Sequence, residues 1–102
     1  MKPSYSLTQL KGLVGSRKYR VTESSFRSAL LMGFLDEDIA DCIVSFLEPS
    51  HFYKTMSADQ MPGLMQDVYK VRYEGKRVYL KLQISKSGHA VIVSFKEDES
   101  FG

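Results

Sequence analysis

The sequence predicts a single α+β domain over residues 1–102, with N-terminal helices packed on one face of a mainly antiparallel sheet. The chain has 102 residues, a length that suits one domain with one modest core. Apolar residues recur at helical spacing in the first half and at alternate positions in the second half. Two turn-forming dipeptides divide the second half into consecutive strands, which indicates antiparallel hairpins.

The first predicted helix begins at a capping-box pattern near the N-terminus. Ser6 is followed three residues later by Gln9, a spacing at which the two side chains cap the first backbone N–H groups of a helix. Leu10 and Val14 then lie one turn apart on a common face. Gly15 is a suitable end for this helix, because glycine readily leaves the helical conformation.

A short strand and a second helix are expected next. Residues 19–22 favour a strand, and either Ser24 or Ser25 is expected to cap the helix that follows. The face of this helix that points to the core is predicted to carry three apolar residues, Phe26, Leu30 and Phe34.

The third predicted helix has the strongest amphipathic pattern in the chain. The acidic residues 36–38 suit a helix N-terminus, where negative charge is favourable. Pro49 is expected to end the helix. Five residues recur at helical spacing on its buried face: Ile39, Cys42, Ile43, Phe46 and Leu47. Cys42 is the single cysteine, and its place on this face predicts a small buried side chain and not a reactive thiol.

The second half predicts four strands. Residues 52–56 form the first, and residues 57–63 are expected to be a polar loop that contains Pro62. The remaining strands are predicted over residues 66–73, 76–84 and 89–96. Glu74-Gly75 and Ser87-Gly88 separate them, and both dipeptides suit two-residue hairpin turns.

The expected turns fix which residues lie opposite one another. The Glu74-Gly75 turn places Lys70 opposite Tyr79 and Arg72 opposite Arg77. The Ser87-Gly88 turn makes Tyr79 face Lys96, and Lys81 face Ser94. On the other side of the sheet it pairs apolar residues: Ile84 with Val91, Leu82 with Val93, and Leu80 with Phe95.

One predicted face of the sheet is therefore strongly basic. Residues 51–96 carry eight Lys and Arg against three Asp and Glu, although the whole chain has a net charge of only +2. No acidic residue falls on this face of strands 66–73, 76–84 and 89–96. Like charges side by side on a sheet are mildly unfavourable, so the pattern favours a polyanionic ligand such as RNA or DNA. A solvated face whose Lys stems cover apolar surface is the structural alternative.

Composition excludes several other classes. No apolar run approaches the length that spans a membrane, and the N-terminus lacks the apolar core of a signal peptide, so a cytoplasmic protein is expected. The absence of a Cys/His cluster argues against a structural zinc site, and we expect no metal and no cofactor. The two histidines, His51 and His89, lie on separate segments, which disfavours a histidine-based ribonuclease.

Five blocks of sequence resemble the MqsR family of toxins from type II toxin–antitoxin systems. The blocks are RSAL at 27–30, HFYKTM at 51–56, QDVY at 66–69, VYLK at 78–81 and VIVSFKE at 91–97. The resemblance is dense over residues 52–97 and looser in the first half. His51 is a departure, because the family often has an acidic residue before the Phe-Tyr-Lys block.

The resemblance implies a RelE-like fold and a metal-independent mRNA interferase that cleaves single-stranded mRNA, often at GCU-type triplets, and arrests translation. It implies a zinc-binding, DNA-binding antitoxin as partner. The implied catalytic positions are Lys54, Gln66, Tyr79 and Lys96. The implied RNA-binding surface carries Tyr53, Met56, Lys70 and Arg72, and the basic face adds Lys81. In an ideal register Gln66 lies opposite Gln83, roughly 13 Å along the strand from Tyr79.

Two other functions stay open at this point. The basic face also suits a nucleic-acid-binding module without catalysis, or a protein-interaction domain that meets an acidic partner. For a toxin, the predicted strand at 19–22 is a candidate sheet edge where an antitoxin strand would pair without covering the basic face.

Overall fold

The computed structural model describes residues 1–100, and it is an α+β domain as predicted. Its elements follow one another in the order expected from the sequence. The helices are α1 (Leu7–Gly15), α2 (Glu23–Leu31) and α3 (Asp36–Asp41), with a π-helical turn at Cys42–Phe46 and a 3-10 turn at Pro49–His51. The strands are β1 (Tyr19–Val21), β2 (Phe52–Ala58), β3 (Met61–Tyr73), β4 (Lys76–Ile84) and β5 (Ala90–Glu97).

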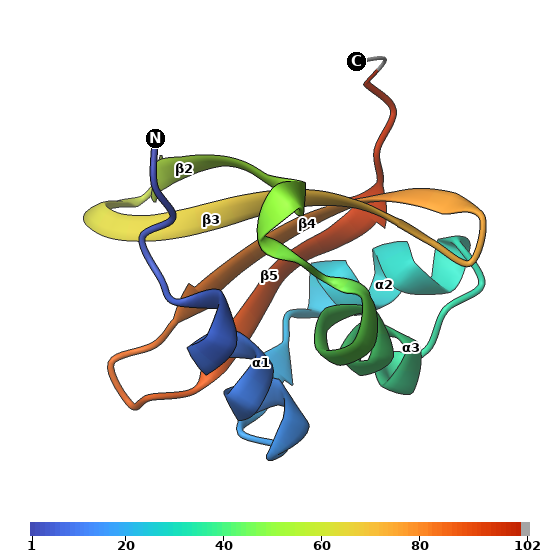
Figure 1. Cartoon of the computed structure of the whole chain (residues 1–102), viewed down its shortest axis with the longest axis horizontal. Helices are drawn as coiled ribbons and strands as arrows, with labels where there is room; N and C mark the ends of the chain where they lie inside the picture. The colour runs from blue at the N-terminus through green and yellow to red at the C-terminus, as the bar shows by residue number, and fades with distance from the viewer. Residues whose placement is uncertain (101–102) are drawn as a thin grey trace.

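The five strands form one twisted sheet in the order β1-β5-β4-β3-β2. The short β1 runs parallel to β5, and every other neighbouring pair is antiparallel. All three α-helices lie on one side of the sheet, while the C-terminal segment leaves β5 on the opposite side (Figure 1). The opposite side is called the open face below. Within residues 1–100, no helix is long and apolar enough to cross a membrane.

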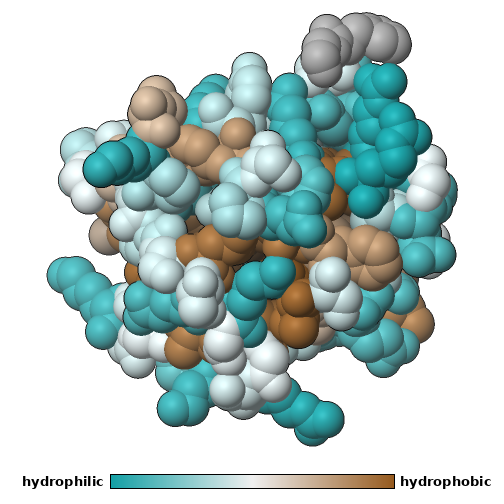
Figure 2. All heavy atoms as spheres, in the orientation of Figure 1, coloured by the Kyte–Doolittle hydropathy of each residue, from teal (hydrophilic) through white to brown (hydrophobic). Residues whose placement is uncertain are grey.

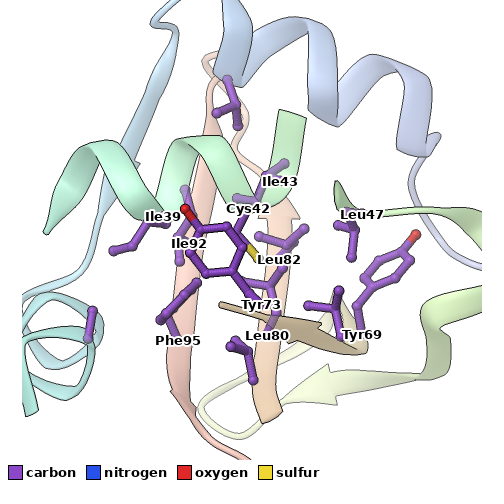
Figure 3. Close-up of a cluster of buried hydrophobic side chains, with 14 of the residues drawn as sticks. Ile39, Cys42, Ile43, Leu47, Tyr69, Tyr73, Leu80, Leu82, Ile92 and Phe95 are labelled. Atoms are coloured by element: carbon purple, nitrogen blue, oxygen red, sulfur yellow. The ribbon is translucent and has the colours of Figure 1, made fainter. Parts of the chain in front are cut away.

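The core fills the space between the helices and the covered face of the sheet. Ile39, Cys42 and Ile43 point from the third helix toward side chains of the strands (Figure 3). The facing strand residues are Tyr69, Tyr73, Leu80, Leu82, Ile92 and Phe95. In the space-filling view, brown apolar atoms show between the sheet and the helices, and hydrophilic atoms cover most of the rim (Figure 2). Cys42 is fully buried, as predicted.

The helix starts follow the sequence signals, with one correction. The Ser6 side chain accepts a hydrogen bond from the Gln9 backbone N–H at 3.2 Å, as the capping pattern predicted. The second helix is capped by Thr22, and not by Ser24 or Ser25. The Thr22 hydroxyl accepts the Ser25 backbone N–H at 3.2 Å, so the helix begins at Glu23.

The predicted buried face of α2 is wrong for Phe26 and Leu30, whereas Phe34, which lies beyond the end of the helix, is buried as predicted. Phe26 and Leu30 are 40% and 44% exposed, whereas Ser25 and Ala29 are buried. The reason is that α2 packs against β5 beyond the end of β1, where small side chains let the helix approach the strand closely. Ser25 donates its hydroxyl hydrogen to the Ile92 carbonyl of β5 at 3.0 Å, a polar contact that hydrophobic periodicity does not reveal.

The third helix changes its winding at Cys42. The segment Cys42–Phe46 is π-helical, and the Leu47 backbone N–H reaches the carbonyl five residues back. This wider turn shifts the residues that follow around the helix axis. Phe46 is 42% exposed, contrary to its predicted burial, although its ring still packs edge-on against Tyr73 at 5.1 Å between centroids. Leu47 is buried as expected.

The predicted loop over residues 57–63 is mostly strand. The β2 strand continues to Ala58 and β3 begins at Met61, so only two residues make the turn. Register shifts at Phe52/Lys54 and at Ser57/Ala58 make this hairpin irregular. Pro62 and Gly63, which have poor strand propensity, are tolerated here because they fall at the register shift and because the β3–β4 pairing reaches only to Asp67, so this end of β3 has β2 as its neighbour on one side.

The β3–β4 hairpin has the register that its turn predicted. Glu74 and Gly75 have φ values of 50° and 78°, and positive φ at both central residues is the geometry of a two-residue turn that matches the strand twist. Lys70 lies opposite Tyr79, and Arg72 lies opposite Arg77. The pairing continues without a bulge from Tyr73 back to Asp67.

The β4–β5 hairpin has the predicted register at its Tyr79 end but not at its loop end. Its connection is a five-residue loop, Ser85–His89, and it pairs Ile84 with Ala90 and Leu82 with Ile92. The predicted partners Val91 and Val93 are therefore wrong at this end. A bulge at Val93 adds one residue to β5 and restores the predicted register beyond it. As a result Tyr79 faces Lys96, and Lys81 faces Ser94, as the sequence indicated.

Two core tyrosines provide a test of how hydroxyl groups contribute to this fold. Tyr73 donates its hydroxyl hydrogen to Asp41 at 2.8 Å, whereas the buried Tyr69 hydroxyl has no hydrogen-bond partner among the described residues. We expect Tyr73→Phe to lower the free energy of unfolding by about 1–2 kcal/mol, because it removes a hydrogen bond to a carboxylate.

The matched change Tyr69→Phe is expected to leave the free energy of unfolding unchanged or to raise it, because it removes a buried polar atom without a partner. Urea unfolding of both variants measures the difference. A larger loss of stability for Tyr69→Phe than for Tyr73→Phe would contradict this description of the core.

Candidate functional site

The open face of the sheet carries most of the residues that the sequence singled out. Lys54 lies opposite Val68, and Met56 opposite Gln66, so β2 presents both side chains on the same face as Lys70 of β3. The two predicted hairpin turns do not determine on which face of the sheet Lys54 lies, whereas the β2–β3 pairing does. The predicted residues that alternate onto this face are Lys54, Met56, Gln66, Lys70, Arg72, Tyr79, Lys81 and Lys96.

Tyr79 is at the centre of this face. It lies on β4 between Lys70 of β3 and Lys96 of β5, and the Lys96 Nζ atom is 5.0 Å from the centre of the Tyr79 ring. These three residues line a groove of about 560 Å³, called the basic groove below. Its other walls come from β2 (Tyr53 and Lys54), from α2 (Ser28, Leu31 and Met32) and from residues 97–100.

Tyr53 reaches the basic groove because of a bulge. It falls at the register shift between Phe52 and Lys54, and its side chain is 54% exposed. The Nζ atoms of Lys70 and Lys54 lie 4.0 and 5.7 Å from the centre of its ring. A cation over an aromatic ring holds the ring in place while leaving its other side accessible for stacking.

Gln66 shares the open face but lies outside the basic groove. The regular β3–β4 pairing keeps it four residues along the strand, roughly 13 Å from Tyr79. The residue is only 9% exposed, and its side-chain amide donates a hydrogen bond to the side-chain oxygen of Gln83 at 2.9 Å. Sequence reasoning noted that Gln83 would lie opposite Gln66 but gave it no role.

The pKa of Tyr79 is determined by more than the two lysines beside it. Lys70 and Lys96 alone would favour the phenolate and lower the pKa of Tyr79. The pKa of Tyr79 is instead raised above 10.0, chiefly by burial, with further contributions from Tyr53 and from Asp98. Tyr79 is therefore a neutral phenol at pH 7, suited to donating a proton and not to accepting one.

Asp98 and Ser100 were missed by the sequence analysis. Asp98 forms an ion pair with Lys70 at 3.7 Å, and its side chain is 11% exposed. Lys70 also donates a hydrogen bond to the Ser100 hydroxyl at 2.8 Å. The signal that was available is the run of three acidic residues at 97–99, directly after the last basic strand.

Neither histidine lies in the basic groove. The His51 ring nitrogen Nδ1 accepts a hydrogen bond from the Glu48 backbone N–H at 3.0 Å, so it stabilises the 3-10 turn before β2. His89 is exposed in the β4–β5 loop. In residues 1–100, no three His, Cys, Asp or Glu side chains are grouped in a way that would hold a metal ion.

The sequence matches a known protein family over nearly its whole length. Residues 2–97 match the protein family described as "Motility quorum-sensing regulator, toxin of MqsA". The chain belongs to the MqsR toxin family. The match ends at Glu97, the last residue of β5, so the segment that contacts Lys70 lies beyond the matched residues.

A curated relative has a name that describes its activity. The protein is similar to the "mRNA interferase toxin MqsR" of Escherichia coli (strain K12), with 37% identity over 95 residues. The alignment covers 93% of this chain and 94% of the relative. Membership of the MqsR family therefore extends over the helices and the whole sheet.

The raised pKa of Tyr79 leads to a direct test. We expect the Tyr79 phenol to ionise above pH 10, because burial and the nearby Asp98 charge both disfavour the phenolate. Tyrosine labelled with ¹³C at the ring carbon that bears the hydroxyl gives a resonance that shifts on ionisation. The spectrum of Tyr79→Phe assigns that resonance by its loss. A midpoint below pH 10 would contradict the assignment of a neutral phenol.

Proposed function

We propose that this member of the MqsR family is an mRNA interferase, an endoribonuclease that cleaves single-stranded mRNA and thereby inhibits translation and growth. The observation that supports this most strongly is the row Lys70–Tyr79–Lys96 across three strands, with Lys54 in the same groove. A proton donor flanked by cations suits a reaction that places charge on phosphate oxygens. The similarity to an E. coli protein named as an mRNA interferase toxin supports the same activity.

RNA supplies its own nucleophile in the proposed reaction. The ribose 2′-oxygen attacks the adjacent phosphorus and its proton leaves to solvent, while the bond from phosphorus to the 5′-oxygen breaks. The products are a 2′,3′-cyclic phosphate and a 5′-hydroxyl. Tyr79 is proposed to give its phenolic proton to the departing 5′-oxygen, which fits the direction of its pKa shift. Lys54 and Lys96 are proposed to offset the negative charge that develops on the phosphate.

The rest of the open face is proposed to bind the RNA strand. Tyr53 offers an accessible ring for base stacking. Lys81 and Arg72 offer cations to the phosphate backbone on either side of Tyr79. Gln66 is proposed to hydrogen-bond a base, with Gln83 holding its amide, and Met56 to contact the base beside it. The preference for GCU-type triplets is carried over from the resemblance to the family.

The proposed reaction needs no metal and no cofactor. Lys54, Lys70 and Lys96 surround the groove and provide the positive charge that a divalent ion otherwise supplies to a phosphate. Among the described residues that line the groove, Asp98 is the carboxylate that forms an ion pair with a lysine, and that lysine is Lys70.

Cleavage of a defined RNA tests the proposal. A single-stranded RNA that contains one GCU triplet is incubated with purified protein in the presence of EDTA. We expect wild-type protein to cut it and Tyr79→Phe to lower kcat/KM by about 100-fold or more, the usual contribution of a general acid. Lys96→Ala is expected to reduce the rate as well, because a charge next to the phosphate is lost.

The matched control is Tyr69→Phe, which makes the same chemical change in the core and is expected to retain the wild-type rate. If Tyr79→Phe and Lys96→Ala both cut normally, the proposed centre is wrong. RNA binding without cleavage by the wild-type protein would favour a non-catalytic nucleic-acid-binding module. Salt-sensitive binding to acidic protein but not to RNA would favour an interaction domain.

We further propose that the partner is a zinc-binding, DNA-binding antitoxin that pairs with the edge strand β1. Membership of the MqsR family implies an antitoxin, and β1 has a strand neighbour on one side only. The Lys18 carbonyl and the Thr22 N–H bond to β5, so the alternate residues Tyr19 and Val21 direct their backbone groups away from the sheet. The strand at this edge, β1, does not line the basic groove.

Hydrogen exchange tests the proposed pairing. We expect the backbone amides of Tyr19 and Val21 to exchange more slowly in the complex with the antitoxin, because an added strand gives them hydrogen-bond acceptors. The amide of Glu74, in the turn between β3 and β4, serves as the reference. Unchanged exchange at both β1 positions, or a complex structure without a strand at this edge, would rule the pairing out.

A further inference from the structure

The C-terminal tail, Asp98–Ser100, lies on the open face and binds two cations, Lys70 of the basic groove and Arg77. The chain leaves the sheet on the side away from the helices (Figure 1). The Asp98 backbone N–H donates to the Arg77 carbonyl at 2.9 Å, which fixes the tail beside β4. The Arg77 guanidinium in turn donates to the Ser100 carbonyl at 3.5 Å. The tail is thus bound at both ends to residues of the open face.

Hydrogen bonds within the tail hold the Asp98 carboxylate beside Lys70. Ser100 donates both its backbone N–H and its hydroxyl hydrogen to the same Asp98 oxygen, at 3.1 and 2.6 Å. The other Asp98 oxygen lies 3.7 Å from the Lys70 Nζ atom. The hydrogen bonds from Ser100, and then the charges of Lys70 and Arg77, lower the pKa of Asp98, so it is ionised at neutral pH.

This arrangement resembles the way a phosphate group would be held. Lys70 contacts the Asp98 carboxylate, the Ser100 hydroxyl and the Tyr53 ring, whose centre is 4.0 Å from its Nζ atom. The anionic oxygen and the hydroxyl oxygen that the tail offers to Lys70 are also what the phosphate and ribose of a nucleotide would offer at this position. Both Lys70 and Asp98 line the groove that contains Tyr79.

The tail also brings the negative charge that the strands of the open face lack. The segment 97–102 contains three acidic residues and no basic ones, directly after a segment with a large basic excess. RNA phosphates and the Asp98 carboxylate would need the same cations, and the side chains of Lys70 and Asp98 are already 76% and 89% removed from solvent. RNA cannot contact Lys70 at this point without displacing the carboxylate.

We propose that Lys70 and Arg77 form a phosphate-binding subsite for the RNA strand, and that the C-terminal tail occupies it as an intramolecular competitor. The Asp98 carboxylate takes the place of one RNA phosphate. Displacement of the tail by RNA opens the subsite and removes a negative charge from beside Tyr79. This inference rests on the proposed RNA substrate and adds Arg77 and the tail to the residues that determine RNA affinity.

The experiment measures RNA affinity without cleavage. A fluorescently labelled single-stranded RNA with 2′-O-methyl groups throughout has no free 2′-hydroxyl and therefore cannot be cut. Its Kd is measured by anisotropy for wild-type protein and for Asp98→Asn at several salt concentrations. We expect Asp98→Asn to bind about 3- to 10-fold more tightly at low salt. The salt dependence should steepen by about 0.7 in log Kd per log salt, the value for one added phosphate contact with a single strand.

Two further variants separate local competition from general charge. Asp59→Asn removes the same charge from the exposed turn between β2 and β3 and is expected to change Kd less than twofold. In a Lys70→Ala background, Asp98→Asn is expected to lose most of its effect, because the cation for which carboxylate and phosphate compete is absent. On an unmodified RNA, Asp98→Asn should lower KM more than it changes kcat.

Each result has a defined meaning. Equal affinity of Asp98→Asn and Asp59→Asn, or a full gain in the Lys70→Ala background, would overturn the proposed competition. A lower melting temperature of Asp98→Asn without tighter RNA binding would mean that the tail only stabilises the end of β5, which also overturns it. Tighter RNA binding without cleavage of unmodified RNA supports the subsite and rejects the nuclease, whereas no RNA binding by any variant rejects both.

Discussion

The turn between β3 and β4 is the constraint on which the site depends. Two consecutive residues with positive φ, Glu74 and Gly75, set the pairing of the two longest strands. That pairing determines which side chains lie next to Tyr79, and it assigns every alternate residue to the core or to the open face. A shift of β4 by one residue relative to β3 would send Tyr79 into the core and bring Leu80 to the open face beside Lys70. The arrangement of side chains in the basic groove therefore depends on the turn at Glu74-Gly75.

The sheet separates stability from function. All helices cover one face, so hydrophobic burial is concentrated there, and the other face is free to hold like charges that contribute little to stability (Figure 1). Asp67 illustrates the separation within one strand. It is buried on the covered side, where it accepts backbone N–H groups of Ser4 and Tyr5 at 2.9 Å each, while its neighbours Gln66 and Val68 belong to the open face.

Much of the fold and of the site could be predicted because both follow from periodicity and turn chemistry. Periodicity and turn chemistry are sufficient to predict the order of the hairpin strands and the row Lys70–Tyr79–Lys96. The errors have physical causes that short-range patterns do not carry. The bulge at Val93 depends on a five-residue loop, the buried face of α2 depends on hydroxyl contacts to β5, and the pKa direction of Tyr79 depends on burial and on a tail that folds back.

The bulge at Val93 has a practical consequence for handling the protein. The bulge separates the register at the loop end of the hairpin from the register at the Tyr79 end. Lys86 and Ser87 are exposed at the tip of that loop. A fluorophore or an affinity handle attached there would label or immobilise the protein while the basic groove stays accessible.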